Sequence, residues 1–270
     1  MCNVFSSSIF GFSTPRTKEG IFFELYVKGI NEEPGFITID WTNFDLSKYL
    51  PDSLLARYES IMPKQAFLNE YKAQFNDSDG MVFTCFKECV SPTALNISEP
   101  LYIGIDLCSG VGKDYTVLTY GQVYNNTAHI LKQDAFNDKT SVQTIEYLNS
   151  TINKYYNSGL KDIILVVETN NMGHSMIQFM IDKIDCPAVS FSPFTTTAKS
   201  KNKIIQQLQL CFEQHKISIP DDQKLLSELA LFTCTINNNG HALFSAPAGS
   251  HDDRVMSLCF CVDRMYVDLF

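Results

Sequence analysis

Residues 101–107, Leu-Tyr-Ile-Gly-Ile-Asp-Leu, constrain the fold more strongly than any other stretch of the sequence. Their period-2 alternation predicts a β-strand with Tyr102, Gly104 and Asp106 on one face and three aliphatic side chains on the other. Because Asp106 has a residue without a side chain as its neighbour on that face, we expect another part of the molecule to approach closely. A turn-rich segment, residues 108–114, follows the strand. Taken alone, Asp106 is also a common residue at the start of a turn.

Two later stretches also place carboxylates at the ends of predicted elements. Residues 162–168 are nearly all apolar, as in a central strand covered on both faces, and they end in Glu168. His251-Asp-Asp-Arg254 opens the last predicted helix, with Asp252 and Asp253 in its first turn. Acids at that position also favour the helix dipole, so helix capping is an alternative explanation for the pair. The histidine before them is equally consistent with a structural role.

Carboxylates on two strand ends and one helix start can meet in the crevice at the carboxyl edge of an open α/β sheet. Several ionised acids in one place repel one another and imply a bound cation. Oxygen ligands favour Mg²⁺ or Mn²⁺ over zinc. We therefore interpret Asp106, Glu168 and Asp252 or Asp253 as candidate metal ligands.

Composition limits the class of protein. The chain has 270 residues, of which 45% are hydrophobic and 19% charged, as in soluble globular proteins. It has no apolar run approaching about 18 residues and no recognisable secretion signal, so we expect a cytosolic protein without a membrane partner. Its nine cysteines include no Cys-x-x-Cys pair and lack histidines at ligand spacing, which predicts buried free thiols and argues against zinc.

The net charge of −9 argues against a broad surface that neutralises nucleic-acid phosphates. Any such contact must be local, and the candidates are Lys199, Lys201 and Lys203. A charge run of this kind is more often a solvated helix start.

From Leu101 onward the predicted order is strand, strand, strand, helix, strand, helix, strand, helix. A hairpin over Asn125-Asn126 extends the first strand antiparallel, and an amphipathic helix covers residues 140–157. A right-handed crossover then returns the next strand parallel to the first, which brings Glu168 close to Asp106.

The remaining elements follow from the same rules of periodicity and punctuation. Later elements are predicted at 174–184 (helix), 188–191 (strand), 199–213 (helix), 217–220 (strand), 222–232 (helix) and across 237–240 (hairpin). Earlier ones are predicted at 8–12 (strand), 21–26 (helix), 36–40 (strand), 52–59 (helix), 65–71 (helix) and 91–100 (linker). A strand so early in the chain needs neighbours that precede it, which suggests a start in the middle of an α/β sheet.

Three motifs together resemble the nuclease domain of the large terminase subunit of tailed bacteriophages and herpes-type viruses. They are Gly104-Ile-Asp106 with residues 112–116, Val167-Glu168 and the polar residues that follow it, and the residues 249–257 around Asp252-Asp253. The resemblance implies an RNase H-like α/β fold, in which an antiparallel three-stranded part and parallel strands form one mixed sheet flanked by helices. It also implies metal-binding and catalytic acids at Asp106, Glu168 and Asp252 or Asp253, with Asp114 as a nearby fourth acid.

The first part of the chain resembles the end of the packaging ATPase in the same family. Ser13-Thr-Pro15 with Phe22-Phe23 is similar to its coupling motif, and residues 67–75 are similar to the segment that joins motor to nuclease. We therefore expect residues 1–92 to be an ATPase remnant with a linker, and residues 93–270 to be the nuclease domain. The phosphate-binding loop is missing from the sequence, so we expect no ATPase activity, with the motor on another polypeptide or lost by truncation.

The resemblance implies an endonuclease that cuts concatemeric double-stranded DNA in the cytoplasm of an infected cell, using two Mg²⁺ or Mn²⁺ ions. The implied partners are the DNA, the packaging ATPase, the small terminase subunit and the capsid portal. Lys199, Lys201 and Lys203 would contact DNA phosphates. Two alternatives remain open, namely another RNase H-like nuclease of the resolvase or transposase type, and a non-catalytic module that docks on the packaging machine.

Overall fold

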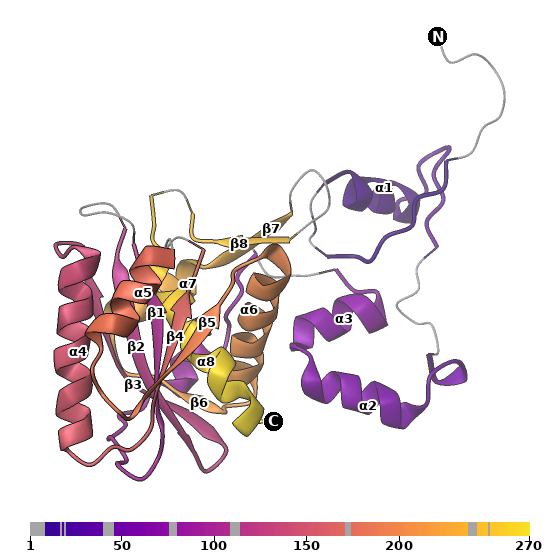
Figure 1. The fold of residues 1–270 in the computed structure, drawn as a ribbon. Coiled ribbons are helices and arrows are strands. Elements are labelled where there is room, and N and C mark those ends of the chain that lie inside the picture. Colours follow the sequence, from indigo (N-terminus) through magenta and orange to yellow (C-terminus); the bar gives the residue numbers. More distant parts are fainter. Residues whose placement is uncertain are drawn as a thin grey trace. The chain divides into compact units, whose positions relative to one another are not determined.

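The computed structural model describes residues 9–16, 18, 20–39, 46–75, 80–108, 114–170, 174–236, 242–247 and 249–270. The chain forms two compact units, Met1–Gly80 and Met81–Phe270 (Figure 1). The sequence predicted a boundary between residues 92 and 93, and the structure places it earlier. The reason is that Phe83 and Phe86 are buried in the core of the second unit, so the segment that carries them cannot separate from it.

The second unit is organised around a six-stranded mixed sheet with the order β5-β4-β1-β2-β3-β6. Strand β2 pairs antiparallel with both β1 and β3. The other pairs are parallel, namely β4 with β1, β5 with β4 and β6 with β3. The turn of the predicted hairpin is confirmed, since Asn125 and Asn126 have φ of 53° and 56°, as a type I′ turn requires. The strands are β1 (Leu101–Asp106), β2 (Thr116–Tyr124), β3 (Thr127–Phe136), β4 (Ile163–Glu168), β5 (Val189–Phe194) and β6 (Ile217–Ser218).

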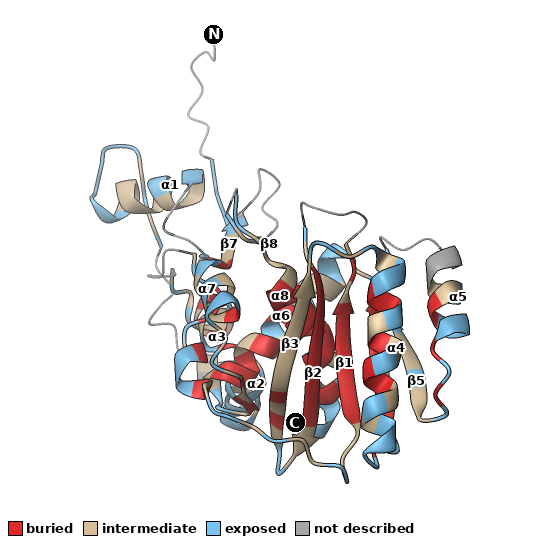
Figure 2. Cartoon of the chain, turned by 90° about the vertical axis from the view of Figure 1, so that its left-hand side faces the viewer, coloured by how far each residue is buried: buried red, intermediate tan, exposed pale blue. Residues whose placement is uncertain are grey.

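Helices cover both faces of this sheet. One face packs on α4 (Ser141–Asn157) and α5 (His174–Lys183), and the other on α6 (Ala198–Glu213), α7 (Gln223–Leu231) and α8 (Asp253–Met265). Figure 2 shows β1 and β2 as the most fully buried strands. A two-stranded sheet, β7 (Thr233–Ile236) and β8 (Ala242–Ser245), and two short 3-10 helices, η2 (Phe86–Cys89) and η3 (Tyr266–Asp268), complete the unit. The predicted RNase H-like mixed α/β sheet is confirmed.

Helix α8 approaches β1 at Gly104, as the sequence predicted for this face of the strand. A Cβ atom on Gly104 would lie 2.3 Å from the carbonyl oxygen of Ser257 and 2.5 Å from the backbone nitrogen of Cys261. The Ser257 hydroxyl lies 3.0 Å from the Gly104 carbonyl oxygen and 2.7 Å from Thr119 Oγ1. The lack of a side chain at Gly104 and the buried hydroxyl of Ser257 thus determine where α8 crosses the sheet.

The first unit contains α1 (Gly20–Ile30), the 3-10 helix η1 (Leu46–Lys48), α2 (Asp52–Ile61) and α3 (Lys64–Lys72). The strands predicted at 8–12 and 36–40 are wrong, because residues 9–12 and 36–39 adopt no regular structure and the rest of those segments lies outside the described residues. A strand exists only by pairing, and no strand occurs among the described residues of this unit.

Two segments on which the resemblance rests contact each other within the first unit. The Asn69 side-chain amide donates to the carbonyl oxygens of Pro15, at 2.7 Å, and Gln74, at 2.8 Å. The Phe75 ring packs against Phe23 and Tyr26, with centroid distances of 5.0 and 4.8 Å. The Ser-Thr-Pro segment and the end of α3 therefore form one small cluster.

None of the helices in the described part of the chain is long and apolar enough to cross a bilayer. The cysteines that the structure describes form no disulfide, and those at 89, 186, 211, 259 and 261 are buried.

Candidate functional site

Asp106 and Glu168 are neighbours at the carboxyl edge of the sheet. Each is the last residue of its strand, and the parallel register pairs Ile105 of β1 with Val167 of β4 immediately before them. Both side chains are partly buried. The predicted adjacency of the two acids therefore follows directly from strand pairing.

The environment of Asp106 disfavours its negative charge. Burial raises the pKa of the Asp106 carboxyl well above its ordinary value, and the charges of Glu168, Asp253 and Asp252 raise it further. The charge of Lys201 acts in the opposite direction. Acids from β1, β4 and the start of α8 thus lie close enough to repel one another at one edge of the sheet.

Asp252 and Asp253 stand at the start of α8 without capping it. Asp252 is the N-cap residue, yet its side chain makes no capping hydrogen bond. The Asp253 carboxylate instead accepts a hydrogen bond from the backbone N–H of Tyr115 at 3.0 Å. His251 Nδ1 lies 3.6 Å from the same oxygen of Asp253, and the His251 ring meets the Tyr115 ring edge to face. A capping hydrogen bond therefore does not explain Asp252, although both acids lie at the positive end of the helix dipole.

The start of α8 is capped by Glu228 of α7. Glu228 Oε2 accepts the backbone N–H of Arg254 at 2.9 Å. Burial raises the pKa of Glu228 to about 7, although the Arg254 backbone hydrogen bond and the Arg254 charge both lower it. Because another helix satisfies this backbone group, the carboxylates of Asp252 and Asp253 are left to face the sheet edge.

The buried Arg254 side chain ties the start of α8 to its surroundings. Its Nη1 atom lies 3.0 Å from Asp222 Oδ2 and 3.3 Å from Gln133 Oε1, and its Nε atom lies 3.8 Å from Glu228 Oε1. The Gln133 amide in turn donates to the Arg254 carbonyl oxygen at 2.9 Å. This network holds the start of α8, and with it the two acids, in one orientation.

The three candidate lysines occupy different positions on α6. Lys201 Nζ lies 3.8 Å from Asp252 Oδ2, at the acidic edge. Lys203 forms an ion pair of 3.1 Å with Asp263, and Lys199 is exposed to solvent. Among the three, only Lys201 contacts a candidate site residue in the described part of the chain.

Asp114, the predicted fourth acid, is exposed and close enough to Asp253 for its charge to raise the pKa of that carboxyl. The rest of the turn before it, residues 109–113, lies outside the described residues. The same holds for residues 171–173, which follow the Glu168 motif.

The donor chemistry of the candidate ligands suits a hard divalent cation, since Asp106, Glu168, Asp252 and Asp253 supply only carboxylate oxygens. Within the described ranges, however, no group of three or more His, Cys, Asp or Glu side chains is arranged as around a metal ion. The negative charges of the acids therefore repel one another, and the Lys201 ammonium lies beside Asp252. Their oxygens do not surround a common point as the ligands of one metal ion would.

Sequence reasoning missed the residues that orient the site. Glu228, Gln133 and Tyr115 act through contacts between elements far apart in sequence. Arg254 carried a usable signal, because a charged residue on an otherwise apolar helical stripe implies a buried partner.

No protein-family model matches the chain. The large terminase subunit of Thermus virus P23-45 is 24% identical over 215 residues, which cover 75% of this chain and 42% of that protein. The chain thus spans less than half the length of this curated relative.

Two solved structures share the fold. The large terminase nuclease from thermophilic phage G20c, with bound magnesium, aligns with a TM-score of 0.56 and 19% identity over 69% of this chain and 98% of its own. The large terminase from another thermophilic bacteriophage aligns with a TM-score of 0.63 and 15% identity over 93% of this chain and 61% of its own. The resemblance to phage large terminases is confirmed.

Proposed function

We propose that this chain supplies the nuclease of a viral DNA-packaging terminase, and that it hydrolyses double-stranded DNA with the help of Mg²⁺ or Mn²⁺. The observation that carries the proposal is the meeting of acids from three elements, β1, β4 and the start of α8, at one sheet edge. The similarity to large terminase subunits supports it, as do the G20c nuclease structures with bound magnesium and with bound cobalt.

In this proposal Asp106, Glu168 and Asp252 or Asp253 hold two divalent ions, with Asp114 close by. Bound ions would activate a water molecule and stabilise the charge that develops on the phosphate. Asp106 would be a ligand of these ions, because burial and the charges of Glu168, Asp253 and Asp252 disfavour its own charge while no cation is bound. The Tyr115 N–H keeps Asp253 turned toward the edge.

The biological setting follows from the same resemblance. We propose that the substrate is concatemeric viral DNA, and that the partners are the packaging ATPase, the small terminase subunit and the capsid portal. The first unit, Met1–Gly80, would be the end of that ATPase.

The direct test is cleavage of plasmid DNA by the purified chain in Mg²⁺ or Mn²⁺. Wild-type protein should nick and linearise the plasmid, and chelation of the metal should stop it. Asp106→Ala and Glu168→Ala should each lower the rate by at least about a hundredfold, since each removes a proposed ligand. Asp138→Ala is the matched control, because it removes an equal charge from an exposed acid that is paired with Lys139. Cutting by Asp106→Ala at the wild-type rate would contradict the proposal.

A docking module of the packaging machine is the second candidate. The first unit favours it, because several of its large apolar side chains are exposed, among them Phe10, Phe12 and Ile37. If purified protein binds metal and DNA without cutting, this candidate becomes the better account.

A further inference from the structure

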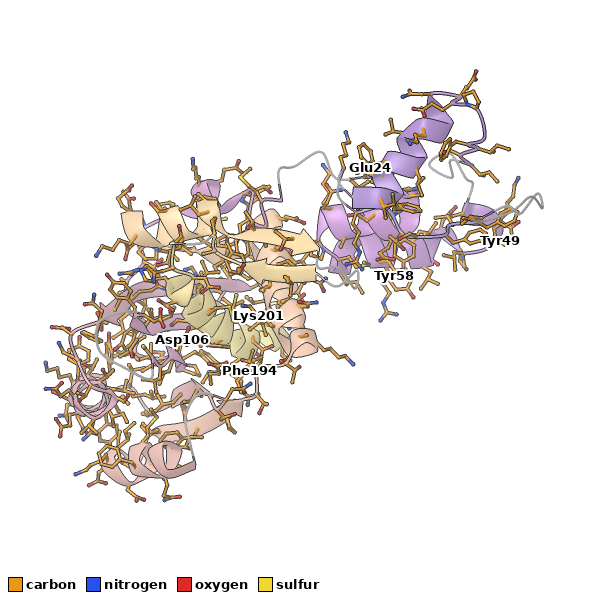
Figure 3. The ribbon with its side chains drawn as sticks, turned by 90° about the horizontal axis from the view of Figure 1, so that it is seen from above. Glu24, Tyr49, Tyr58, Asp106, Phe194 and Lys201 are labelled. Carbon is orange, nitrogen blue, oxygen red and sulfur yellow. The ribbon has the colours of Figure 1, made fainter. Side chains whose placement is uncertain are left out.

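Lys201 lies inside the acidic edge. Its ammonium is 3.8 Å from Asp252 Oδ2, and both side chains are largely shielded, with 27% and 30% of their surface exposed. The charge of Lys201 also lowers the pKa of Asp106 at the end of β1, against the effect of burial and the neighbouring acids. Figure 3 labels both Asp106 and Lys201, which come from β1 and α6 respectively. The acidic edge therefore already has one cation beside it, which belongs to the chain itself.

Helix stability does not explain this position. Lys201 lies in the first turn of α6, near the positive end of the helix dipole, where a positive charge is unfavourable. The start of that helix is satisfied by a capping box between Thr197 and Ser200. Attraction to the acids is the interaction that favours the ammonium here.

The contact is also easy to break. A separation of 3.8 Å exceeds hydrogen-bond distance, and partly exposed ion pairs of this kind are weak. The lysine stem is long and flexible, so its ammonium can move to another anion without a change in the backbone. A DNA phosphate at the edge would be such an anion.

We propose that Lys201 competes with divalent metal for Asp252 and is drawn away by a DNA phosphate, so that DNA binding and metal loading favour each other. This inference rests on the proposed function. Without DNA, the ammonium lies beside one oxygen of the proposed metal site and lowers metal affinity. With DNA, the phosphate takes the ammonium and releases that oxygen. Linkage requires the reverse effect as well, in which metal strengthens DNA binding by the same factor.

The test is calorimetric titration of the full chain with Ca²⁺, which takes oxygen ligands and should support little cleavage, with and without a short DNA duplex. Lys201→Met keeps the apolar stem and removes the charge, and should bind Ca²⁺ about fivefold more tightly than wild type without DNA. The duplex should tighten Ca²⁺ binding to wild type and leave Lys201→Met unchanged. Lys201→Arg, which keeps the charge, should behave as wild type.

Lys203→Met is the matched control, because it removes the same charge from the same helix but from an ion pair with Asp263. Without DNA, it should bind Ca²⁺ as wild type does. Equal or weaker Ca²⁺ binding by Lys201→Met would overturn the inference, and so would equal tightening in both methionine variants, which would indicate a general field effect. If wild type binds neither Ca²⁺ nor Mn²⁺, the proposed function itself fails.

Discussion

Glu228 is a buried carboxylate whose charge changes near neutral pH. Its pKa, raised by burial to about 7, exceeds the ordinary value of 4.5. The folded state therefore holds the proton to higher pH than the unfolded state, and the contribution of this residue to stability falls as pH rises from about 4.5 to about 7.

Glu228→Gln should remove that pH dependence, because an amide does not ionise and its oxygen can still accept the Arg254 N–H. Melting temperatures measured from pH 5 to pH 8 should fall more steeply for wild type than for Glu228→Gln. Parallel curves would show that the charge of Glu228 is not disfavoured in the folded protein.

At the residue scale, the acids were predictable and their partners were not. Asp106 and Glu168 end apolar runs, so strand periodicity alone places them at the sheet edge. The positions of Lys201 and Glu228 depend on how α6 and α7 pack beside α8, which no local pattern encodes. The sequence therefore left capping by Asp252 and Asp253 open, and the structure resolves it by showing Glu228 as the cap.

At the scale of elements, α8 requires glycine at position 104. An alanine Cβ there would lie 2.3 and 2.5 Å from backbone atoms of α8, which cannot move without shifting the helix. We expect Gly104→Ala to destabilise the second unit by about 3 kcal/mol or more. Thermal or denaturant unfolding measures this loss.

Gly121 is the control for that prediction. A Cβ at Gly121 would meet only side-chain atoms, including Ile130 Cδ1 at 3.0 Å and Met265 Cε at 3.1 Å, and these can yield. Gly121→Ala should therefore cost much less than Gly104→Ala. Equal losses would mean that close packing of α8 at Gly104 is not what the glycine provides.

Elements with strong hydrophobic periodicity were predicted well, because the face that is apolar in the sequence is also the face that packs in the core. The strands and helices of the second unit lie where the sequence places them, to within a few residues at their ends. Residues 8–12 and 36–40 were predicted as strands from their local pattern. A local pattern indicates a preference for extended backbone, whereas a strand also needs a partner to pair with.

At the scale of the whole molecule, the boundary between units was the least predictable feature. Residues 91–100 have two prolines and weak periodicity, which is typical of a linker. In the structure, buried Gln122 accepts the Asn96 N–H and donates to the carbonyl oxygens of Asn96 and Glu99. One glutamine on β2 thus binds an irregular segment to the sheet, which explains why that segment belongs to the second unit.

If the acidic edge binds divalent metal, as we propose, it does so at a cost in stability. Asp106→Asn keeps the shape of the side chain and removes a charge that burial and three neighbouring acids disfavour. Without metal, this variant should melt at the same temperature as wild type or higher. Asp138→Asn serves as the control, because Asp138 is an exposed acid with 75% of its side chain accessible.

The decisive measurement is the melting temperature of the second unit's transition in wild type, Asp106→Asn and Asp138→Asn, with and without Mg²⁺ or Mn²⁺. Metal that binds the folded state should raise the melting temperature of wild type and Asp138→Asn, and raise that of Asp106→Asn much less. Equal metal-induced rises in all three proteins, or outright unfolding of the unit by Asp106→Asn, would contradict the account.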